Sequence, residues 1–373
     1  MQNIFKENRF DELKKYIDTF DKQKIFFVVD AGSFELSGAK EFIEKRLQLS
    51  TDAIFSDFNP NPEIEDLKKG IQLFKANDYE LIVAIGGGSA LDMAKLISIM
   101  AHQDESLEQI TKGKASIKNK KTELLAIPTT AGTGAEATAF SVLYIGKVKY
   151  SVANPSILPN AVYLSSEFSM SAPAYLTAST GLDAFSQAIE SLWSVGANEE
   201  SEAYSLEAID LVWKNLKKAV LDNDTEAKSK MQEAAFLAGK AINITKTTAP
   251  HALSYAFTSY YNIPHGHAVC ISLPFFFEYN YNVTDKDCTD KRGSQDVKQR
   301  IDKIFKLLNT DIEHITEVLT NFFNEIKVNI DIPNLITDFN PDLIIRNVNL
   351  ERLSNNPRRL EEQDMMSFLG GKR

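Results

Sequence analysis

The feature that most constrains the fold is a run of glycines that interrupts an apolar segment at residues 81–95, LIVAIGGGSALDMAK. The apolar stretch 81–85 is rich in β-branched residues, which is typical of a strand buried in a parallel sheet. The glycines Gly86, Gly87 and Gly88 let backbone N–H groups approach an anion, because no Cβ obstructs them. We therefore expect a strand, a phosphate-binding loop and a helix, with a tight turn that binds no ligand as the alternative.

The residues after the glycines form a helical pattern that begins near Ser89. A serine at this place predicts an N-cap, and the positive end of the helix then faces the anion. Asp92 and Lys95 follow in the first turns of the same helix. By itself this loop predicts a phosphate site and little more.

Strand and helix patterns alternate along the first part of the chain, which predicts a parallel sheet with right-handed crossovers. The expected strands are 24–30, 52–58, 81–85 and 124–128, and the expected helices are 39–49 and 62–76. A second loop of small residues, 129–138 (TTAGTGAEAT), follows the last of these strands. Ligands of such sheets bind beyond the carboxyl ends of the strands, so both loops are expected at one edge, as a dinucleotide site.

The pattern changes at about Ser171 to long amphipathic stretches, which predict a mostly helical second half. Because 373 residues exceed what one core usually fills, we expect two domains. These are an α/β dinucleotide-binding domain at residues 1–170 and an all-helical domain at residues 171–373. The expected helical stretches of the second domain are 181–195, 201–221, 226–244 and 297–308, and the polar stretch 285–296 is expected to be a solvated loop.

The formal net charge of −10 disfavours nucleic acid and anionic membranes as partners. The chain has two cysteines and no C-x-x-C pair, so we expect no disulfide framework and a cytoplasmic location. Charges throughout residues 1–20 argue against a signal peptide, and no apolar run reaches the length of a membrane span.

Three of the five histidines, His251, His265 and His267, lie within seventeen residues in the second half. Upstream, Asp183 and Gln187 are four residues apart, so both project from one face of a helix. Carboxylate and imidazole groups from different helices are typical of a metal site with open positions. Satisfied structural histidines and an ordinary polar helix face are the alternative.

Four motifs together resemble the iron-containing (group III) alcohol dehydrogenase family: GGGSALDMAK, PTTAGTGAEAT, TGLDAFSQAIES, and a histidine followed fourteen residues later by that of PHG. They span residues 24–274, and NPR at 356–358 is compatible. The resemblance implies a dinucleotide-binding α/β domain, the dehydroquinate synthase-like architecture with a helical domain, and a divalent metal in a cleft between the domains. It also implies hydride transfer between a nicotinamide and an alcohol or aldehyde, and we expect a homodimer.

By this resemblance the metal ligands are Asp183, His251 and His265. Where most family members have a histidine one turn after the aspartate, this chain has Gln187. An amide oxygen is a weaker ligand than an imidazole for Fe²⁺ or Zn²⁺, so either the affinity falls or the protein supplies three ligands. Metal identity stays open between these two ions. His267 is a candidate proton relay, or else a solvent-facing histidine after a turn glycine.

The resemblance also implies which residues bind the cofactor. Asp30 ends the first expected strand, where a carboxylate accepts hydrogen bonds from a ribose and repels a 2′-phosphate, so NAD(H) is expected over NADP(H). The alternative for Asp30 is that it caps a helix or turn. Lys149 is a basic residue near the cofactor with a possible catalytic role, or else a solvated charge on a strand. The full expected cofactor set is Asp30, Gly86, Gly87, Gly88, Ser89, Asp92, Thr129, Thr130, Thr133 and Lys149.

Gln187 and a basic residue five positions before the first metal histidine are similar to phosphonoacetaldehyde reductases, which form 2-hydroxyethylphosphonate. An anionic phosphonate requires fixed cations and hydroxyl donors. The candidates are Lys246, Thr247, Ser254 and Arg358, with solvated surface residues as the alternative for the two cations. The other functions to consider are a general alcohol, diol or glycerol dehydrogenase, a degenerate nucleotide-binding member without redox turnover, and a metal- and NAD-using lyase such as a dehydroquinate synthase.

Overall fold

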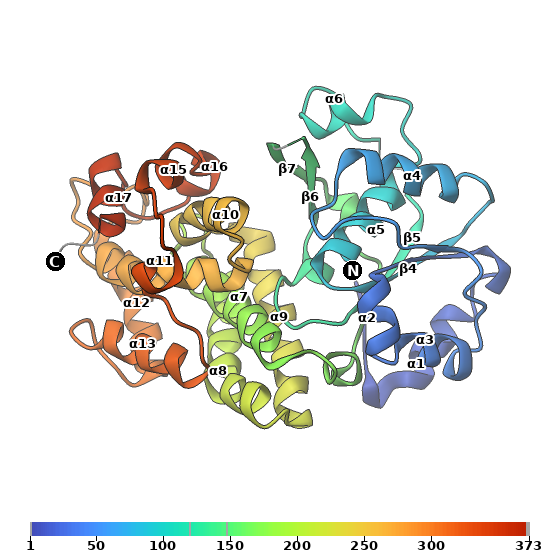
Figure 1. Cartoon of the computed structure of the whole chain (residues 1–373), viewed down its shortest axis with the longest axis horizontal. Helices are drawn as coiled ribbons and strands as arrows, with labels where there is room; N and C mark the ends of the chain where they lie inside the picture. Colours follow the sequence, from blue (N-terminus) through green and yellow to red (C-terminus); the bar gives the residue numbers. More distant parts are fainter. Residues whose placement is uncertain (1, 119–120, 147, 371–373) are drawn as a thin grey trace. The chain divides into compact units, whose positions relative to one another are not determined.

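The structure of the chain is a computed structural model that describes residues 2–118, 121–146 and 148–370. Its internal contacts divide the chain into two compact units, Met1–Ala172 and Pro173–Arg373. These are unit 1 and unit 2 (Figure 1).

Unit 1 is built around a six-stranded parallel sheet in the order β1-β8-β5-β4-β2-β3. The strand that leads into the glycine loop, β4, lies in the interior of the sheet between β5 and β2, which explains its continuous burial. Gly86 at the end of β4 pairs with Pro128 at the end of β5. The glycine loop and the threonine-rich loop therefore start side by side, as expected. The strands are β1 Asn3–Lys6, β2 Ile25–Val29, β3 Ile54–Phe55, β4 Leu81–Gly86, β5 Glu123–Pro128 and β8 Ala161–Leu164.

Helices flank this sheet, and an antiparallel pair, β6 Phe140–Ile145 with β7 Val148–Ala153, stands apart from it. The helices are α1 Phe10–Ile17, α2 Ala31–Leu36, α3 Ala39–Glu41, α4 Ile64–Phe74, α5 Gly88–Met100 and α6 Leu107–Thr111. The expected helix 39–49 is shorter, because α3 passes into a π-helical turn at Phe42–Arg46 and Gln48 adopts a left-handed backbone. The expected strand 52–58 is reduced to β3, an edge strand whose one partner strand among the described residues is β2.

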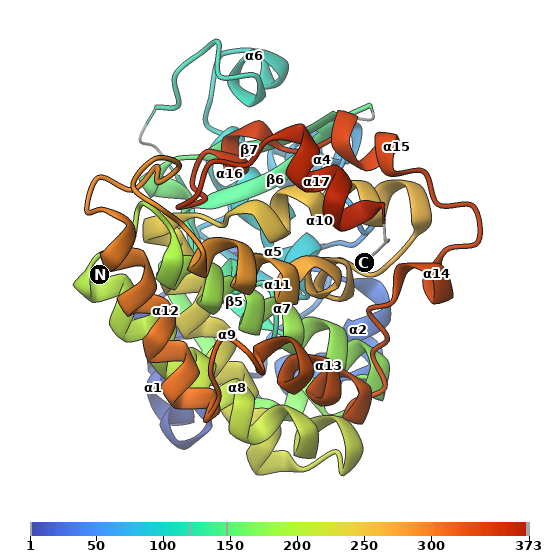
Figure 2. The ribbon, with the colours of Figure 1, turned by 90° about the vertical axis from the view of Figure 1, so that its left-hand side faces the viewer.

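Unit 2 is helical, as predicted. The helices are α7 Ala174–Trp193, α8 Glu199–Leu221, α9 Thr225–Thr245, α10 Ala249–Tyr261, α11 His265–Tyr281, α12 Ser294–Leu308, α13 Ile315–Glu325, α14 Ile332–Leu335, α15 Pro341–Arg346, α16 Leu350–Leu353 and α17 Glu362–Leu369. Helices α7, α8 and α9 pack on one another, and α7 also packs on α11. The short C-terminal helices α15 and α16 lie against α10 (Figure 2).

The prediction of a solvated loop at 285–296 was wrong in part. Asp290 is buried, and its carboxylate accepts hydrogen bonds from Arg292 and Arg300. Helix α12 begins within the stretch, at Ser294, so Arg300 on its second turn reaches back to the loop. A run of polar residues here holds a buried ion-pair network that composition does not reveal.

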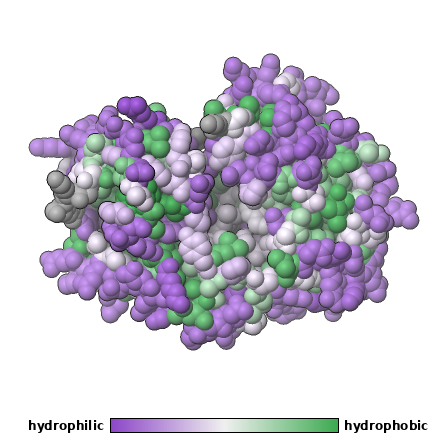
Figure 3. Space-filling model, viewed as in Figure 1, coloured by the Kyte–Doolittle hydropathy of each residue, from purple (hydrophilic) through white to green (hydrophobic). Residues whose placement is uncertain are grey.

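Hydrophilic side chains cover much of the visible face of each unit, with apolar residues scattered among them (Figure 3). Within the described residues, no helix combines the length and the apolar character that a bilayer crossing needs.

Candidate functional site

The glycine loop of unit 1 is closed in by its neighbours. Gly86 has φ +151°, and a Cβ there would lie 2.7 Å from the Cβ of Ala90 and 3.0 Å from the Cβ of Asp30. At Gly88 a Cβ would lie 2.9 Å from the Cγ2 of Thr133, on the second loop. A side chain at either position would therefore force its neighbours to move, so the glycines are required by packing as well as by backbone conformation.

The expected N-cap at Ser89 was wrong. Gly87 occupies the N-cap of α5 in an extended conformation, and α5 begins without a side-chain cap. Ser89 lies inside the first turn, and its hydroxyl donates to the carbonyl oxygen of Pro60. A helix start without a side-chain cap directs backbone N–H groups toward the loop, which is the arrangement that binds an anion.

The threonine-rich loop is tied to the glycine loop through its backbone. The N–H of Thr129 donates to the carbonyl oxygen of Gly86 over 3.0 Å. The hydroxyl oxygen of Thr129 is buried without a hydrogen-bond partner among the described residues. Thr130 faces Gly87, since its Oγ1 lies 3.4 Å from where a Cβ of Gly87 would be. A bound polar group would satisfy the Thr129 hydroxyl.

Asp30 is the N-cap of α2, and its Oδ1 accepts a hydrogen bond from the backbone N–H of Ser33 over 2.7 Å. The structure therefore contains the capping interaction that was the alternative for this residue. The side chain is nevertheless near the glycine loop, because its Cβ approaches Gly86.

A buried polar cluster under the loops was not anticipated. Lys95 is fully buried, and its Nζ donates to the Oγ1 of Thr138 and to the carbonyl oxygen of Phe140, both over 2.9 Å. Asp92 accepts from the backbone N–H of Val142 over 3.0 Å, which joins α5 to β6. Burial raises the pKa of Glu136, within the threonine-rich loop, to about 7.

Lys149 lies on β7, opposite Tyr144 of β6. Its positive charge acts on Asp92, where it offsets part of the effect of burial on the pKa of that carboxyl. Lys149 is thus electrostatically linked to the cluster beneath the loops.

In unit 2 the structure brings together Asp183 of α7, His251 of α10 and His265 at the start of α11. One potential ligand atom from each of them lies within 4.8 Å of the other two. The Nε2 of His251 is 3.2 Å from the Oδ1 of Asp183. Burial would lower the pKa of His251, but the charges and hydrogen bonds of Glu190 and Asp183 raise it to about 10. The space between these side chains thus favours positive charge, either a proton or a metal ion.

Gln187 lies one turn after Asp183 and is buried. Its side chain forms a hydrogen bond with the Asp183 carboxylate. Its Oε1 has no partner among the described residues. A buried acceptor without a donor is destabilising. A cation held by Asp183, His251 and His265 would satisfy the Oε1 of Gln187.

Sequence reasoning missed Glu190, which is fully buried on α7. Its Oε1 accepts from the Nδ1 of His251, and its Oε2 accepts from the backbone N–H and the hydroxyl of Thr248 over 2.7 and 2.8 Å. The available signal was its spacing: Glu190 is seven residues after Asp183, which places both on one face of the helix.

Gly266 allows α7 and α11 to approach each other. A Cβ at Gly266 would lie 1.9 Å from the carbonyl oxygen of Ser179 and 2.9 Å from the Cβ of Asp183. The next residue back, His265, stacks on Tyr255 with ring planes 2° apart. The hydroxyl of Ser254 lies 3.5 Å from His265 Nδ1 and donates to the carbonyl oxygen of His251.

Lys246 ends α9 in a conformation that lysine rarely adopts, with φ +62° and ψ 178°. This region of backbone space is used almost only by glycine, and a residue with a side chain stays there only when its surroundings hold it. The neighbouring Thr247 is buried, and its carbonyl oxygen accepts from Asn355.

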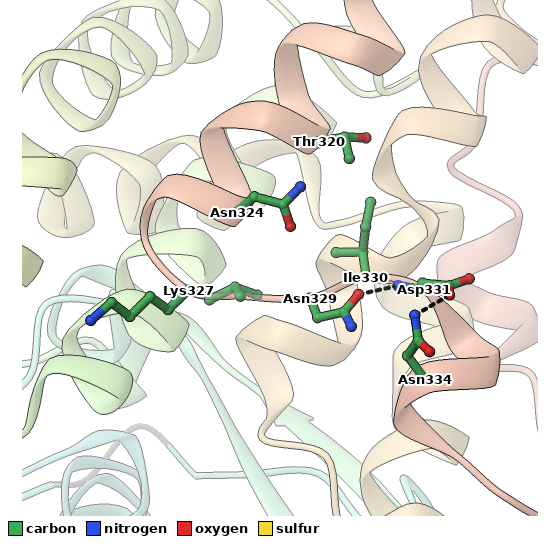
Figure 4. A pocket seen from close by; sticks show the side chains of 8 residues that line it. Thr320, Asn324, Lys327, Asn329, Ile330, Asp331 and Asn334 are labelled. Atoms are coloured by element: carbon green, nitrogen blue, oxygen red, sulfur yellow. Dashed lines mark hydrogen bonds between the residues drawn. The ribbon is translucent and has the colours of Figure 1, made fainter.

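His267 has both ring nitrogens engaged. Its Nδ1 lies 2.7 Å from the hydroxyl oxygen of Tyr175, and its Nε2 donates to the carbonyl oxygen of Asn329. Burial lowers the pKa of His267, which favours the neutral ring. Asn329 belongs to an open hollow of polar residues, which shares no residue with the Asp183 cluster (Figure 4). The hollow is lined by Thr320, Asn324, Lys327, Val328, Asn329, Ile330, Asp331 and Asn334.

Arg358 has structural partners. Its guanidinium donates to Asp287 over 2.7 Å and to the carbonyl oxygen of Tyr279 over 2.8 Å, and it lies over the Tyr279 ring. These contacts hold the guanidinium against Asp287 and Tyr279.

Two family descriptions match the chain. "Iron-containing alcohol dehydrogenase" matches residues 2–166, and "Fe-containing alcohol dehydrogenase family, C-terminal" matches residues 177–370.

Among curated relatives, the chain is 34% identical over 273 residues to aldehyde-alcohol dehydrogenase 2 of Entamoeba histolytica. This match covers 69% of the chain but only 31% of that longer relative. Alcohol dehydrogenase 4 of Saccharomyces cerevisiae is 32% identical over 283 residues, which cover 74% of each protein.

Solved structures resemble the whole chain. Sulfoacetaldehyde reductase from Bifidobacterium kashiwanohense in complex with NAD⁺ superposes with a TM-score of 0.87 and 28% identity, covering 100% of this chain and 98% of that one. A 1,3-propanediol oxidoreductase gives a TM-score of 0.82 and 26% identity, with 99% and 97% coverage. The chain therefore belongs to the iron-containing alcohol dehydrogenase family, and its class as an alcohol or aldehyde oxidoreductase follows from that membership.

Proposed function

We propose that the chain reduces an aldehyde that carries a phosphonate group, phosphonoacetaldehyde, to 2-hydroxyethylphosphonate with NAD(H) and a divalent metal. The observation that carries the substrate class is the backbone of Lys246, a lysine held where glycine is favoured in the connection that leads into the helix of His251. The cluster of Asp183, His251 and His265 and the two neighbouring loops of unit 1 support the reaction type.

The residues of unit 2 fit a metal. Asp183, His251 and His265 would supply three ligands, and Gln187 would present its unpartnered Oε1. A bound Fe²⁺ or Zn²⁺ would act as a Lewis acid toward the aldehyde oxygen. Carboxylate and imidazole suit both ions, and the family description favours iron.

The residues of unit 1 fit a dinucleotide. The glycine loop would bind the pyrophosphate at the start of α5, and Thr129, Thr130 and Thr133 would line the adenosine side. NAD(H) would supply or accept the hydride. Asp30 disfavours a 2′-phosphate near the loop, and the related sulfoacetaldehyde reductase was solved with NAD⁺.

Lys246 supplies the positive charge in this proposal. Backbone strain of this kind costs on the order of 1–3 kcal/mol, which a glycine would avoid. A lysine at this position is explained if its ammonium group is needed at the site. Thr247 adds a hydroxyl to the same connection. We assign Ser254 to the orientation of His265 and give Arg358 no substrate role, because its guanidinium is engaged by Asp287 and Tyr279.

His267 is our candidate for proton relay. Its Nε2–H donates to the carbonyl oxygen of Asn329, so its Nδ1 is an acceptor for the hydroxyl proton of the half-exposed Tyr175. This pair would move a proton between the site and solvent at the Tyr175 oxygen.

Sulfoacetaldehyde is a second candidate substrate, because a structure closely similar to this chain is a sulfoacetaldehyde reductase. Sulfonate and phosphonate share tetrahedral oxyanion chemistry, and phosphonate carries up to two charges rather than one. Both substrates would require the same cation.

The test compares NADH consumption with phosphonoacetaldehyde, sulfoacetaldehyde and propionaldehyde across Fe²⁺, Zn²⁺ and Mn²⁺. We expect kcat/KM for phosphonoacetaldehyde to exceed that for propionaldehyde about 100-fold, the size of one or two charge-assisted hydrogen bonds. Higher efficiency with sulfoacetaldehyde would favour the second candidate, and comparable efficiency with all three aldehydes would refute an anionic substrate.

The Lys246→Gly variant tests the cation directly. We expect it to lose about 30-fold more efficiency on phosphonoacetaldehyde than on propionaldehyde, while Tm rises because the strain is relieved. Lys327→Gly is the matched control, since Lys327 also has φ +62°. It should raise Tm without changing the substrate ratio. An equal loss on both aldehydes in Lys246→Gly would contradict the assignment.

A further inference from the structure

We infer that Glu190 is a positioning residue that orients His251 for metal binding and at the same time anchors the connection that carries Lys246. One carboxylate would then control both metal affinity and preference for an anionic aldehyde. The inference rests on the proposed function, in which His251 is a metal ligand and Lys246 binds the substrate anion.

The first step concerns the imidazole. Glu190 Oε1 accepts from Nδ1 of His251, which leaves Nε2, directed toward Asp183, as the ring nitrogen available to a metal ion. Metal-binding histidines are commonly oriented in this way by a carboxylate on the other ring nitrogen, which also makes the ligating nitrogen more basic. Glu190 is fully buried, so water does not replace it in this role.

The second step concerns the start of α10. Its N-cap, Thr248, makes no side-chain cap, and Pro250 in the first turn has no N–H to donate. The Oε2 of Glu190 accepts from the N–H of Thr248 over 2.7 Å and from that of His251 over 3.4 Å. A carboxylate from α7 thus caps α10, and its negative charge is favourable at the positive end of that helix.

The third step concerns the segment between α9 and α10. Thr248 Oγ1 donates to Glu190 and accepts from the Nε1 of Trp193. Three residues earlier, Thr245 Oγ1 donates to Ser191 over 2.9 Å. Lys246 lies between these two anchors, and Glu190, Ser191 and Trp193 are all on the last turns of α7. The strained backbone of Lys246 is therefore flanked by contacts to the same end of α7 that orients His251.

Among the described residues, every hydrogen bond to the side-chain carboxylate of Glu190 comes from Thr248 or His251. The carboxylate therefore links these two residues and no others. A glutamine has the same shape but offers one acceptor where the carboxylate offers two, so it cannot satisfy both sides.

The experiment titrates metal-stripped protein with Zn²⁺ and Co²⁺ alone, without substrate or cofactor, and records the visible spectrum of the Co²⁺ form. We expect Glu190→Gln to weaken Zn²⁺ binding about 10- to 100-fold and to alter the Co²⁺ spectrum. Its ratio of kcat/KM for phosphonoacetaldehyde to that for propionaldehyde should fall at least fivefold.

Ser191→Ala is the matched control. It removes the hydrogen bond from Thr245 to Ser191 and leaves the contact between Glu190 and His251 intact, so the substrate ratio should fall while Zn²⁺ affinity changes less than threefold. Circular dichroism and NADH titration verify that each variant is folded, since NADH binding depends on unit 1.

The outcomes separate the two claims. If the wild type binds neither ion, or if His251→Ala binds as tightly as the wild type, the proposed metal site fails. If the wild type binds and His251→Ala does not, but Glu190→Gln keeps wild-type affinity and spectrum, the proposed function stands and the inference about Glu190 is overturned. The inference about Glu190 is also overturned if Ser191→Ala weakens metal binding as much as Glu190→Gln does.

Discussion

The candidate sites of the two units are built by different means. In unit 1 the candidate site consists of two loops, Gly86–Gly88 and Thr129–Thr133, each a continuous stretch of chain. Neighbouring strands fix where the two loops start, and their proposed binding groups are largely backbone N–H groups. In unit 2 the site consists of side chains from α7, α10 and α11, which lie far apart in the sequence. A loop site tolerates changes in side chains but no added bulk, whereas a cluster depends on each of its polar atoms.

The largest effect should come from His265→Ala in unit 2. Loss of one proposed ligand from a site that already has Gln187 in place of a third histidine should abolish metal binding and lower kcat/KM about 10³-fold or more, because a metal contributes several kcal/mol to such reactions. Metal content and NADH oxidation measure the change.

Affinity for NADH, measured by fluorescence titration, should remain within twofold in this variant. His314→Ala is the control, since His314 is exposed and pairs with Asp311. A parallel loss of NADH affinity in His265→Ala would show that the two sites are not built independently.

The second effect concerns pH. Burial raises the pKa of Glu136 in unit 1 to about 7 from an ordinary value of 4.5. The contribution of protonated Glu136 to the free energy of unfolding of unit 1 should therefore be fully present below pH 4.5. It should be lost as pH rises to 7, by at most about 3 kcal/mol. Hydrogen exchange of the β4 and β5 amides at pH 5 and pH 8 measures this fall, and Glu136→Gln should remove it.

Unit 2 offers the contrast. Burial acts to raise the pKa of Asp290, but hydrogen bonds from Arg292 and the charge of Arg300 outweigh it and lower the pKa. This contribution is lost only as pH falls below the ordinary range of an aspartate, near 4. The tryptophans, Trp193 and Trp213, are both in unit 2, so their fluorescence reports its unfolding, and the stability difference between the wild type and Asp290→Asn should be the same at pH 5 and pH 8. A flat response in β4 and β5 would contradict the assignment for Glu136.

The smallest effect should come from Gly88→Ala. One added carbon would press on Thr133, and overpacking of this size costs about 1–3 kcal/mol, so NADH affinity should fall about tenfold while metal binding is kept. Gly32→Ala is the control, because its added Cβ would make an ordinary contact of 3.7 Å with Asp30. Unchanged NADH affinity in Gly88→Ala would show that the two loops are free to separate.

The same contrast explains how much of the fold and of the two candidate sites could be predicted from the sequence. The parallel sheet, the helical second half and the two loops follow from local patterns of apolar residues and glycine, and the structure confirms them. The grouping of Asp183, His251 and His265 was predictable only through resemblance to a family, since spacing alone left structural histidines open.

The features that were missed depend on contacts between distant residues. No local pattern shows that Glu190 accepts from Thr248 and His251, or that Arg358 is engaged by Asp287 and Tyr279. The N-cap was misplaced at Ser89 because Gly87 can also start a helix. The expectations of a homodimer and of a cytoplasmic location stay predictions, and light scattering of the purified protein would check the first.

Gly266 carries a consequence for mutational scanning. The space for a side chain at this position is filled by the backbone of α7, so the distance between Asp183 and His265 is set by direct contact of two helix backbones. A position that donates no ligand should therefore be as intolerant of substitution as the proposed ligands themselves. A relative that retains Asp183 and both histidines but has lost this glycine should be classified as unable to hold the ion, however intact its ligand pattern looks.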